Sequence, residues 1–352
     1  MMKIKSIIQY LESIAPSAYQ ESYDNAGLIV GDKEAEVTGV LCCLDSIEEI
    51  IEEAIALKCN LVVAHHPIVF KGLKRFTGRS YVERVVMKAI KNDIAIYAIH
   101  TNLDNVYYRG VNAKIAEKID LRNTKILAPK GKLNKLSTVV PATHSEILRK
   151  ALFEVGGGQV NGSNNVSYAS LGVGTFAKKS EAHIRLEVTF PNVLKGAILN
   201  ALMSNHPLEF PIYDIFSIEN TNLEIGSGMI GDLVKPMKEL DFLKFLKKQM
   251  DVGCIKYTKL RGKEIQKVAL CGGSGGFLLR NAMAQKADIF ITADYKYHEF
   301  FDADGKIIIA DIGHYESEQF TINLLHDLIS QKFPNFAVHL TKVNTNPVSY
   351  LC

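Results

Sequence analysis

The sequence lacks any apolar run long enough to cross a membrane. Its uninterrupted runs, such as residues 94–99 and 307–310, are far shorter than the roughly 18 residues that a spanning helix needs. The N-terminal stretch begins with two lysines and is soon interrupted by polar side chains, which is typical of an amphipathic helix and not of a secretory signal. We therefore expect a cytoplasmic protein.

The sequence also has little excess charge and few cysteines. Lys and Arg number 41 against 38 Asp and Glu, a net charge of +3, so charge does not imply nucleic-acid binding. The six cysteines include no Cys-x-x-Cys pair. Cys42 and Cys43 lie in an apolar run, where we expect small core residues and no structural disulfide.

What is present is the composition of a globular protein. Hydrophobic residues make up 47% of the chain and charged residues 22%, which excludes a disordered or low-complexity chain. A length of 352 residues predicts about two domains.

Two parts of the chain alternate apolar strand-like runs with helical patterns. Such alternation predicts an α/β fold made of βαβ units, with a parallel sheet covered on both faces. In the first part the segments are residues 37–44, 46–57, 60–64, 82–92, 94–99 and 111–119. In the last part they are residues 267–271, 277–286, 288–292, 306–310 and a long helix over 315–331.

The middle of the chain follows a different order. Residues 128–234 read as strand, helix, two strands around a loop-rich stretch, helix and strand, which is the βαββαβ order of a ferredoxin-like module. We predict an inserted domain over 128–234. Residues 1–127 and 235–352 would then be the two halves of one discontinuous core domain.

Four histidines follow predicted strands. His65 and His66 come after residues 61–64, His100 after 94–99, and His314 shortly after 307–310. A single histidine at a strand end is usually an ordinary hydrogen-bonded residue. Because the carboxyl ends of parallel strands share one crevice, two in succession with two more at similar positions predict a common site.

Carboxylates accompany these histidines. His314 and Glu318 are four residues apart, so on a helix they share one face, and Asp104 follows His100 closely. The His-x-x-x-Glu spacing alone is a weak signal. With His65 and His66 the set reaches three imidazoles and two carboxylates, too many for one open zinc site and suited to two ions that share a bridge.

Two further segments leave alternatives open. Asp294 and His298 follow another strand and are either groups that orient ligands or carry protons, or a helix-capping Asp and a surface His. The glycine-rich segment 272–276 lies between a strand and a helix. It is either a phosphate cradle at a helix N-terminus or a tight structural turn.

These residues resemble the Nif-three-like dinuclear-metal proteins, whose members are named GTP cyclohydrolase 1 type 2 homologues. The resemblance covers essentially the whole chain. The segments that carry it, in order, are Tyr23-Asp24-Asn25-Ala26-Gly27-Leu28, His65-His66-Pro67-Ile68-Val69-Phe70, His100-Thr101-Asn102-Leu103-Asp104, Cys271-Gly272-Gly273-Ser274-Gly275, Thr292-Ala293-Asp294 through His298, and Gly313-His314-Tyr315-Glu316-Ser317-Glu318.

The resemblance implies a toroidal homohexamer with a two-metal site in each subunit facing the inner cavity. It also implies that the inserted domain is similar to PII and CutA modules. Glu318 would be the bridging ligand. The implied metal ligands are His65, His66, Asp104, His314 and Glu318.

The chemistry that these residues predict is metal-assisted hydrolysis of a nucleotide or another phosphoester, with GTP cyclohydrolase activity as the family's name suggests. His100 or His298 would carry the proton. Nitrogen and oxygen ligands suit two divalent ions of zinc, iron, manganese, cobalt or nickel. The alternative is a non-catalytic metal-binding ring that acts as a carrier, chaperone or regulatory scaffold.

Overall fold

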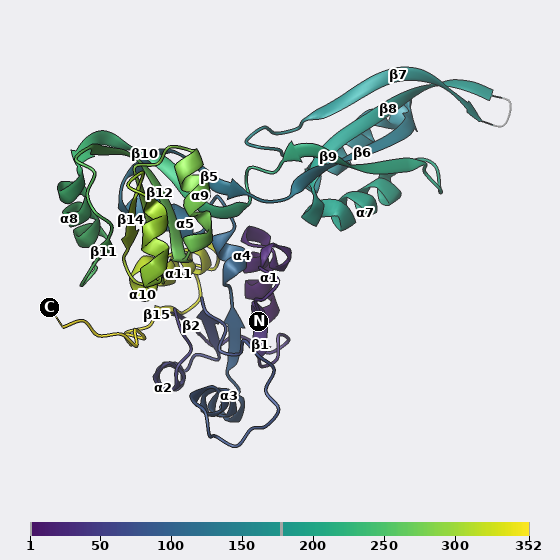
Figure 1. The fold of residues 1–352 in the computed structure, drawn as a ribbon. Coiled ribbons are helices and arrows are strands. Elements are labelled where there is room, and N and C mark those ends of the chain that lie inside the picture. The colour runs from purple at the N-terminus through teal and green to yellow at the C-terminus, as the bar shows by residue number, and fades with distance from the viewer. Residues whose placement is uncertain (1, 177–178, 352) are drawn as a thin grey trace. The chain divides into compact units, whose positions relative to one another are not determined.

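The computed structural model describes residues 2–176 and 179–351 (Figure 1). The chain divides into two compact units. One consists of Met1–Ala128 together with Gly226–Cys352, and the other of Pro129–Ile225. Within the described residues, no helix has the length and apolar character needed to span a membrane.

The first sheet of the larger unit has five strands. Both of its faces are covered, because alternate residues of its inner strands pack into two separate hydrophobic clusters. Helices α2 (Glu48–Ala56) and α3 (Tyr81–Lys91) cover one face, and α1 (Ile4–Ile14) and α11 (Thr321–Lys332) cover the other. The strand order is β1 (Gly27–Val30), β4 (Ala95–Ala98), β3 (Leu61–Ala64), β2 (Val40–Cys43) and β15 (Val338–Leu340).

The second sheet has six strands and an inner parallel part. Helices α5 (Val111–Lys118) and α8 (Glu239–Gln249) pack on one face, and α9 (Leu279–Ala284) packs on the other. The strand order is β11 (Lys256–Tyr257), β14 (Ile308–Asp311), β13 (Ile289–Ala293), β12 (Glu264–Ser274), β10 (Gly226–Lys238) and β5 (Leu121–Pro129).

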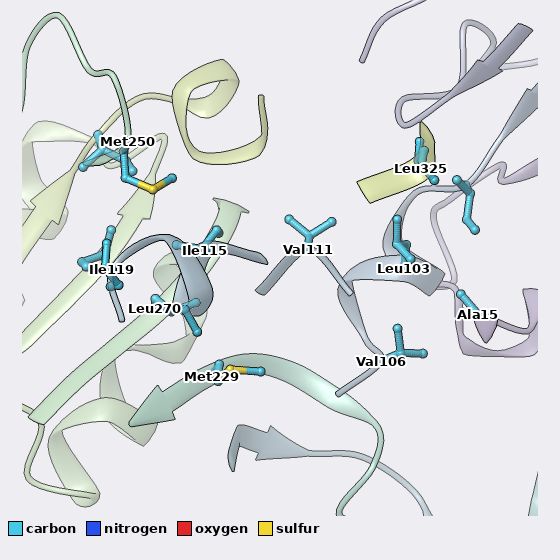
Figure 2. Packing of buried hydrophobic residues seen from close by; sticks show 14 of the residues in the cluster. Ala15, Leu103, Val106, Val111, Ile115, Ile119, Met229, Met250, Leu270 and Leu325 are labelled. Carbon is cyan, nitrogen blue, oxygen red and sulfur yellow. The ribbon is translucent and has the colours of Figure 1, made fainter. Parts of the chain in front are cut away.

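One hydrophobic cluster joins the two sheets of this unit. Figure 2 shows part of it, where Leu103 and Val106 from the side of the first sheet lie near Val111, Ile115 and Leu270. The sheets also exchange strands, since β5 from the first part of the chain lies in the second sheet and β15 from the last part lies in the first. These shared contacts fix the carboxyl ends of the strands of both sheets around one site.

The strands predicted from the sequence are parallel to one another within each sheet, but neither sheet is parallel throughout. β2, β3, β4 and β15 are parallel, as are β12, β13 and β14. The strands β1, β10 and β11 pair antiparallel with β4, β12 and β14. The long helix predicted over 315–331 is divided into two helices, α10 (His314–Glu318) and α11, by a turn at Gln319 and Phe320.

The smaller unit contains one antiparallel sheet and two helices. Leu136, Leu186, Leu148 and Ile198 belong to its own hydrophobic core. In chain order its elements are β6 (Lys132–Pro141), α6 (Ser145–Glu154), β7 (Ser167–Phe176), β8 (Lys179–Pro191), α7 (Lys195–Asn205) and β9 (Tyr213–Thr221), and the sheet order is β7-β8-β6-β9. Residues 226–234, which we placed in the insert, belong to β10 and pair with β12 of the other unit.

The remaining elements are short. They are the helix α4 (Thr101–Asp104) and the 3-10 turns η1 (Ser17–Tyr19), η2 (Ala142–His144), η3 (Asn192–Leu194), η4 (Gly276–Leu278) and η5 (Tyr297–Ala303).

Candidate metal centre

The strand ends of both sheets of the larger unit meet at one cluster of imidazoles and carboxylates. His65 and His66 directly follow β3, and His100 precedes α4, whose last residue is Asp104. From the second sheet, β14 leads into α10, which begins at His314 and ends at Glu318. Residues 252 positions apart in the chain are therefore neighbours.

Glu318 lies at the centre of this cluster and is 3% exposed. Its Oε2 atom is 3.0 Å from Nε2 of His66, 3.2 Å from Nε2 of His314 and 3.7 Å from Nε2 of His65. Asp104 Oδ1 is 3.7 Å from the same His65 nitrogen. Glu318 belongs to two sets of donor atoms, and the atoms within each set all lie within 4.8 Å of one another. One set also contains His66 and His314, and the other contains His65 and Asp104.

The opposite nitrogen of each of these imidazoles is held by an oxygen that can only accept. Nδ1 therefore donates and keeps its hydrogen, so Nε2, which faces the cluster, is the nitrogen that can bind a metal once it is deprotonated. This is the arrangement in which proteins orient histidine ligands of metals. The pairs are His65 Nδ1 with the Ile99 carbonyl at 2.9 Å, His66 Nδ1 with Asp45 Oδ1 at 2.8 Å, and His314 Nδ1 with Asp294 Oδ2 at 2.7 Å.

Two polar atoms of the cluster are buried without a hydrogen-bond partner in the described part of the chain: Nε2 of His65 and Oδ1 of Asp104. A buried polar atom that makes no hydrogen bond costs free energy. The two atoms lie 3.7 Å apart, and both are of types that bind metals. The donor set fits a divalent cation.

The charges of the cluster are strongly perturbed. Burial and the neighbouring Glu318 raise the pKa of Asp104 to about 7. Burial also raises the pKa of Glu318, but His314 and the other imidazoles outweigh it and hold that pKa well below its usual value. Burial lowers the pKa of His66 and of His314, yet their carboxylate partners prevail and raise the two pKa values to about 10 and about 11.

His100 also faces the cluster and is held by Asp24. Its ring centroid is 5.4 Å from that of His65 and 5.2 Å from that of His66. Its Nδ1 donates to Asp24 Oδ1 at 2.7 Å, and Asp24 Oδ2 accepts from the Thr101 amide at 3.0 Å. Burial alone would raise the pKa of Asp24, but the bonds from His100 and Thr101 lower it to about 2.

His298 is not brought to the cluster. It lies in η5 with its ring 5.1 Å from that of Tyr297, and it does not line the cavity described below. Asp294, from the same predicted segment, does act on the site because it orients His314. The segment therefore contributes an orienting carboxylate to the site, whereas His298 lies outside the cavity.

The glycine-rich segment is the end of β12 and the short turn that follows it. Three of its five amides already donate to side chains of the protein, which argues against a phosphate cradle. Gly273 has a φ of 61°, and a Cβ there would lie 2.5 Å from Oε1 of Glu318. A glycine at this position therefore leaves room for the Glu318 carboxylate. The Gly272 amide donates to Asn112 Oδ1 at 3.0 Å, the Gly273 amide to Ser317 Oγ at 2.9 Å and the Gly275 amide to Thr292 Oγ1 at 2.9 Å.

Sequence reasoning missed the orienting residues Asp45 and Asp24. Asp45 follows β2 after a single residue, so the strand-end argument used for the histidines also applies to it. Asp24 lies in a segment without regular secondary structure. No strand-end signal marks it.

A cavity of about 1150 Å³ opens over the cluster, lined by segments of both sheets of the larger unit. Aromatic side chains line it and remain largely exposed. They are Tyr23 at 70%, Phe70 at 53%, Tyr81 at 56% and Phe277 at 67%.

Comparison with known proteins agrees with this geometry. The family model described as Duf34/NIF3 (NGG1p interacting factor 3) matches residues 2–347. The chain belongs to the Duf34/NIF3 family. This confirms the resemblance found in the sequence motifs. Curated members named GTP cyclohydrolase 1 type 2 homolog include one from Bacillus subtilis, 33% identical over 368 residues, with 99% of this chain and 98% of the relative covered. Another from Staphylococcus epidermidis is 32% identical, with 99% and 100% covered.

Solved structures of the Duf34/NIF3 family share the fold. A Bacillus cereus protein related to NIF3 is 33% identical with a TM-score of 0.88, and 99% of each chain is covered. A Staphylococcus aureus protein is 29% identical with a TM-score of 0.81 and the same coverage. The mixed α/β architecture with several sheets is therefore that of its relatives.

Proposed function

We propose that the protein is a metal-dependent hydrolase with two divalent ions, acting on a nucleotide or another phosphoester. The observation that carries the proposal is the convergence of three oriented imidazole nitrogens on Glu318. The unpartnered buried atoms of His65 and Asp104 support the same reading.

The two donor sets suggest how the ions are shared. His66 and His314 would hold one ion, and His65 and Asp104 the other. Glu318 belongs to both sets and would bridge them. Nitrogen and oxygen donors of this kind suit zinc, iron, manganese, cobalt or nickel.

Divalent ions bound here would lower the pKa of a water molecule and stabilise the negative charge that develops on the atoms bonded to the attacked phosphorus or carbon. The chain's own residues supply the rest. Asp45, Asp294 and the Ile99 carbonyl hold the ligand rings in place. The exposed aromatic rings at the cavity give a planar base surfaces to stack on.

We assign the proton-carrier role to His100. Asp24 fixes its Nδ1 as a donor, so Nε2 is the nitrogen that exchanges a proton. His298, the other sequence candidate, lies outside the cavity. A His100→Gln variant should keep its metal and lose turnover, whereas His298→Gln should keep both.

The name of the curated relatives, GTP cyclohydrolase 1 type 2 homolog, supports a nucleotide among the substrates to be tested. A panel of nucleotides and phosphoesters should be assayed with manganese, zinc and iron for the wild type, Asp104→Ala and Glu318→Ala. Asp302→Ala, which removes an exposed carboxylate of η5, is the matched control.

The expected result is turnover of at least one substrate by the wild type and the control, and its loss in both site variants. If no substrate is turned over faster by the wild type than by both variants, the hydrolase proposal fails. Bound metal without turnover would then favour the non-catalytic carrier or regulatory scaffold.

We further propose that residues 129–225 form a ferredoxin-like domain of the PII/CutA kind, inserted into the core, and that the protein assembles as a homohexamer. The element order and antiparallel sheet order of this unit support the first proposal. Family membership over the full chain supports the second. Light scattering at micromolar concentration tests it, and a monomer or dimer would contradict it.

A further inference from the structure

The segment that leads from the cavity over the metal centre to the start of α3 concentrates positive charge. We call residues 70–81 the basic loop. It carries Lys71, Lys74, Arg75 and Arg79 and has no Asp or Glu. The net charge of +3 for the whole chain conceals this local excess.

The four cations of the basic loop are exposed. In the described part of the chain none of them makes an ion pair. The cations of the following helix behave differently, since Arg84 pairs with Glu48 of α2 at 2.7 Å and Lys88 pairs with Glu52. The loop therefore keeps its charge available for a ligand.

The basic loop is held in place at both ends. Near its start, Asn25 Nδ2 donates to the Val69 carbonyl at 2.6 Å. Near its end, Glu83 accepts from the Thr77 amide at 2.7 Å, from the Thr77 hydroxyl at 2.9 Å and from the Arg79 amide at 3.3 Å. The bonds to Glu83 fix the backbone of the basic loop. Because the loop is already ordered, it loses less conformational entropy when it binds a ligand.

The two ends of the basic loop line the cavity over the metal centre. Phe70 at its start places its ring 5.8 Å from that of His100, edge to face, and Tyr81 at its end lines the same cavity. Both rings are more than half exposed. The four cations lie on the segment that leaves the cavity at one aromatic ring and returns at the other.

Several carboxylates of the cavity are already paired with cationic or imidazole groups. Asp45 and Asp294 accept from His66 and His314, and Asp311 pairs with Lys256 at 2.7 Å. The cavity, at about 1150 Å³, exceeds the roughly 300–1,000 Å³ of ordinary small-molecule sites. It has room for more than one small ligand unit.

We propose that the basic loop binds a single-stranded nucleic acid and brings it to the metal centre. The cations contact successive phosphates, and bases stack on Phe70 and Tyr81, the combination by which proteins hold single strands without reading their sequence. This inference rests on the proposed function and narrows its substrate from any phosphoester to a strand. Hydrolysis of one linkage adds water across one P–O bond and leaves a phosphate on one product and a hydroxyl on the other.

Binding is tested by fluorescence anisotropy with a labelled twelve-nucleotide thymidine strand, in manganese and in EDTA. The loop variant combines Lys71→Gln, Lys74→Gln, Arg75→Gln and Arg79→Gln. A control variant makes the same change at four exposed lysines at and near α8: Lys238, Lys244, Lys247 and Lys248. A third variant combines Phe70→Ala with Tyr81→Ala.

We expect the loop variant to weaken binding by more than about tenfold and to reduce the slope of log Kd against log salt by about 3, since each contact to a single strand contributes about 0.7. The aromatic variant, which removes two stacking rings, should weaken binding by about thirtyfold or more. The α8 control should bind as the wild type does.

Equal binding by the loop variant and the α8 control would overturn the inference. The inference would also be overturned if thymidine monophosphate displaced the labelled strand as strongly as the unlabelled strand does, at equal phosphate concentration. Either result leaves the hydrolase proposal standing if a small phosphoester is turned over. Loop-dependent binding of the strand without turnover of any substrate supports the binding site and contradicts the hydrolase proposal.

Discussion

The Nε2 atoms of His66 and His314 lie 3.4 Å apart, although the two residues are 248 positions apart in the chain. Each ring is turned to this position by a carboxylate on its other nitrogen, Asp45 for His66 and Asp294 for His314. Both nitrogens also face Oε2 of Glu318. Two imidazole nitrogens and a carboxylate oxygen at such distances need protons or a cation between them.

The sharing of Glu318 between two donor sets predicts how metal content responds to mutation. His314→Ala should lose one of two ions, Asp104→Asn should lose the other, and Glu318→Gln should lose most of both. The double variant His65→Ala/His314→Ala should be nearly metal-free. Metal analysis of the purified variants checks this, with His326→Ala, a partly exposed histidine of α11, as the control.

Retention of two ions per chain by the double variant would refute the ligand assignment. Equal loss from every variant, including the His326 control, would indicate general destabilisation and not a specific site. Circular dichroism on the same samples separates the two explanations.

Removal of the carboxylate behind His66 should weaken metal binding without removing a ligand. Asp45→Ala deletes the acceptor of the Nδ1 hydrogen, so the ring loses its fixed tautomer and orientation. Loss of such a partner typically costs ten- to a hundredfold in metal affinity. Calorimetric titration of the apoprotein with zinc measures the change. An affinity within twofold of that of Asp302→Ala would show that Asp45 does not orient the ligand.

Metal binding should release protons at neutral pH. The pKa values of His66 and His314 are raised to about 10 and about 11, so both rings are protonated in the apoprotein at pH 7. A metal binds only the deprotonated nitrogen, and affinity must rise as pH rises toward these values. Calorimetry in two buffers of different ionisation enthalpy should give about two protons released. A heat of binding that does not depend on the buffer would contradict the prediction.

The predicted convergence of His65, His66 and His314 needed only the rule that parallel strands end at a common edge. That rule works here because β3 is apolar throughout and β14 is apolar up to its last residue, Asp311, so both strands are easily recognised. The spacing of His314 and Glu318 then placed both on one helical turn, and the helix α10 does begin and end at these residues.

The parts that could not be predicted depend on contacts distant in sequence. β15 has three residues and pairs with β2, about 300 positions earlier, so no local pattern marks it. The role of the glycine segment was undecided because its amide partners Asn112, Ser317 and Thr292 come from three other elements. His298 shared the strand-end signal of Asp294, but the chain turns into η5 before it and carries it away from the cavity.

The bond between Asp24 and His100 should make stability depend on pH. The pKa of Asp24 is lowered to about 2 in the folded protein, against about 3.9 when unfolded. Because its pKa is lower in the folded state, the ionised carboxylate stabilises the fold at pH values above the unfolded-state pKa. This stabilisation is lost as the pH falls from about 4 to about 2. Asp24→Asn should therefore reduce the free energy of unfolding by about 2 kcal/mol at pH 7 and by about half as much at pH 3. Urea unfolding of the metal-free protein at both pH values measures the difference, and Asp302→Asn is the control. A loss of the same size at both pH values would show that the carboxylate charge is not what stabilises this contact.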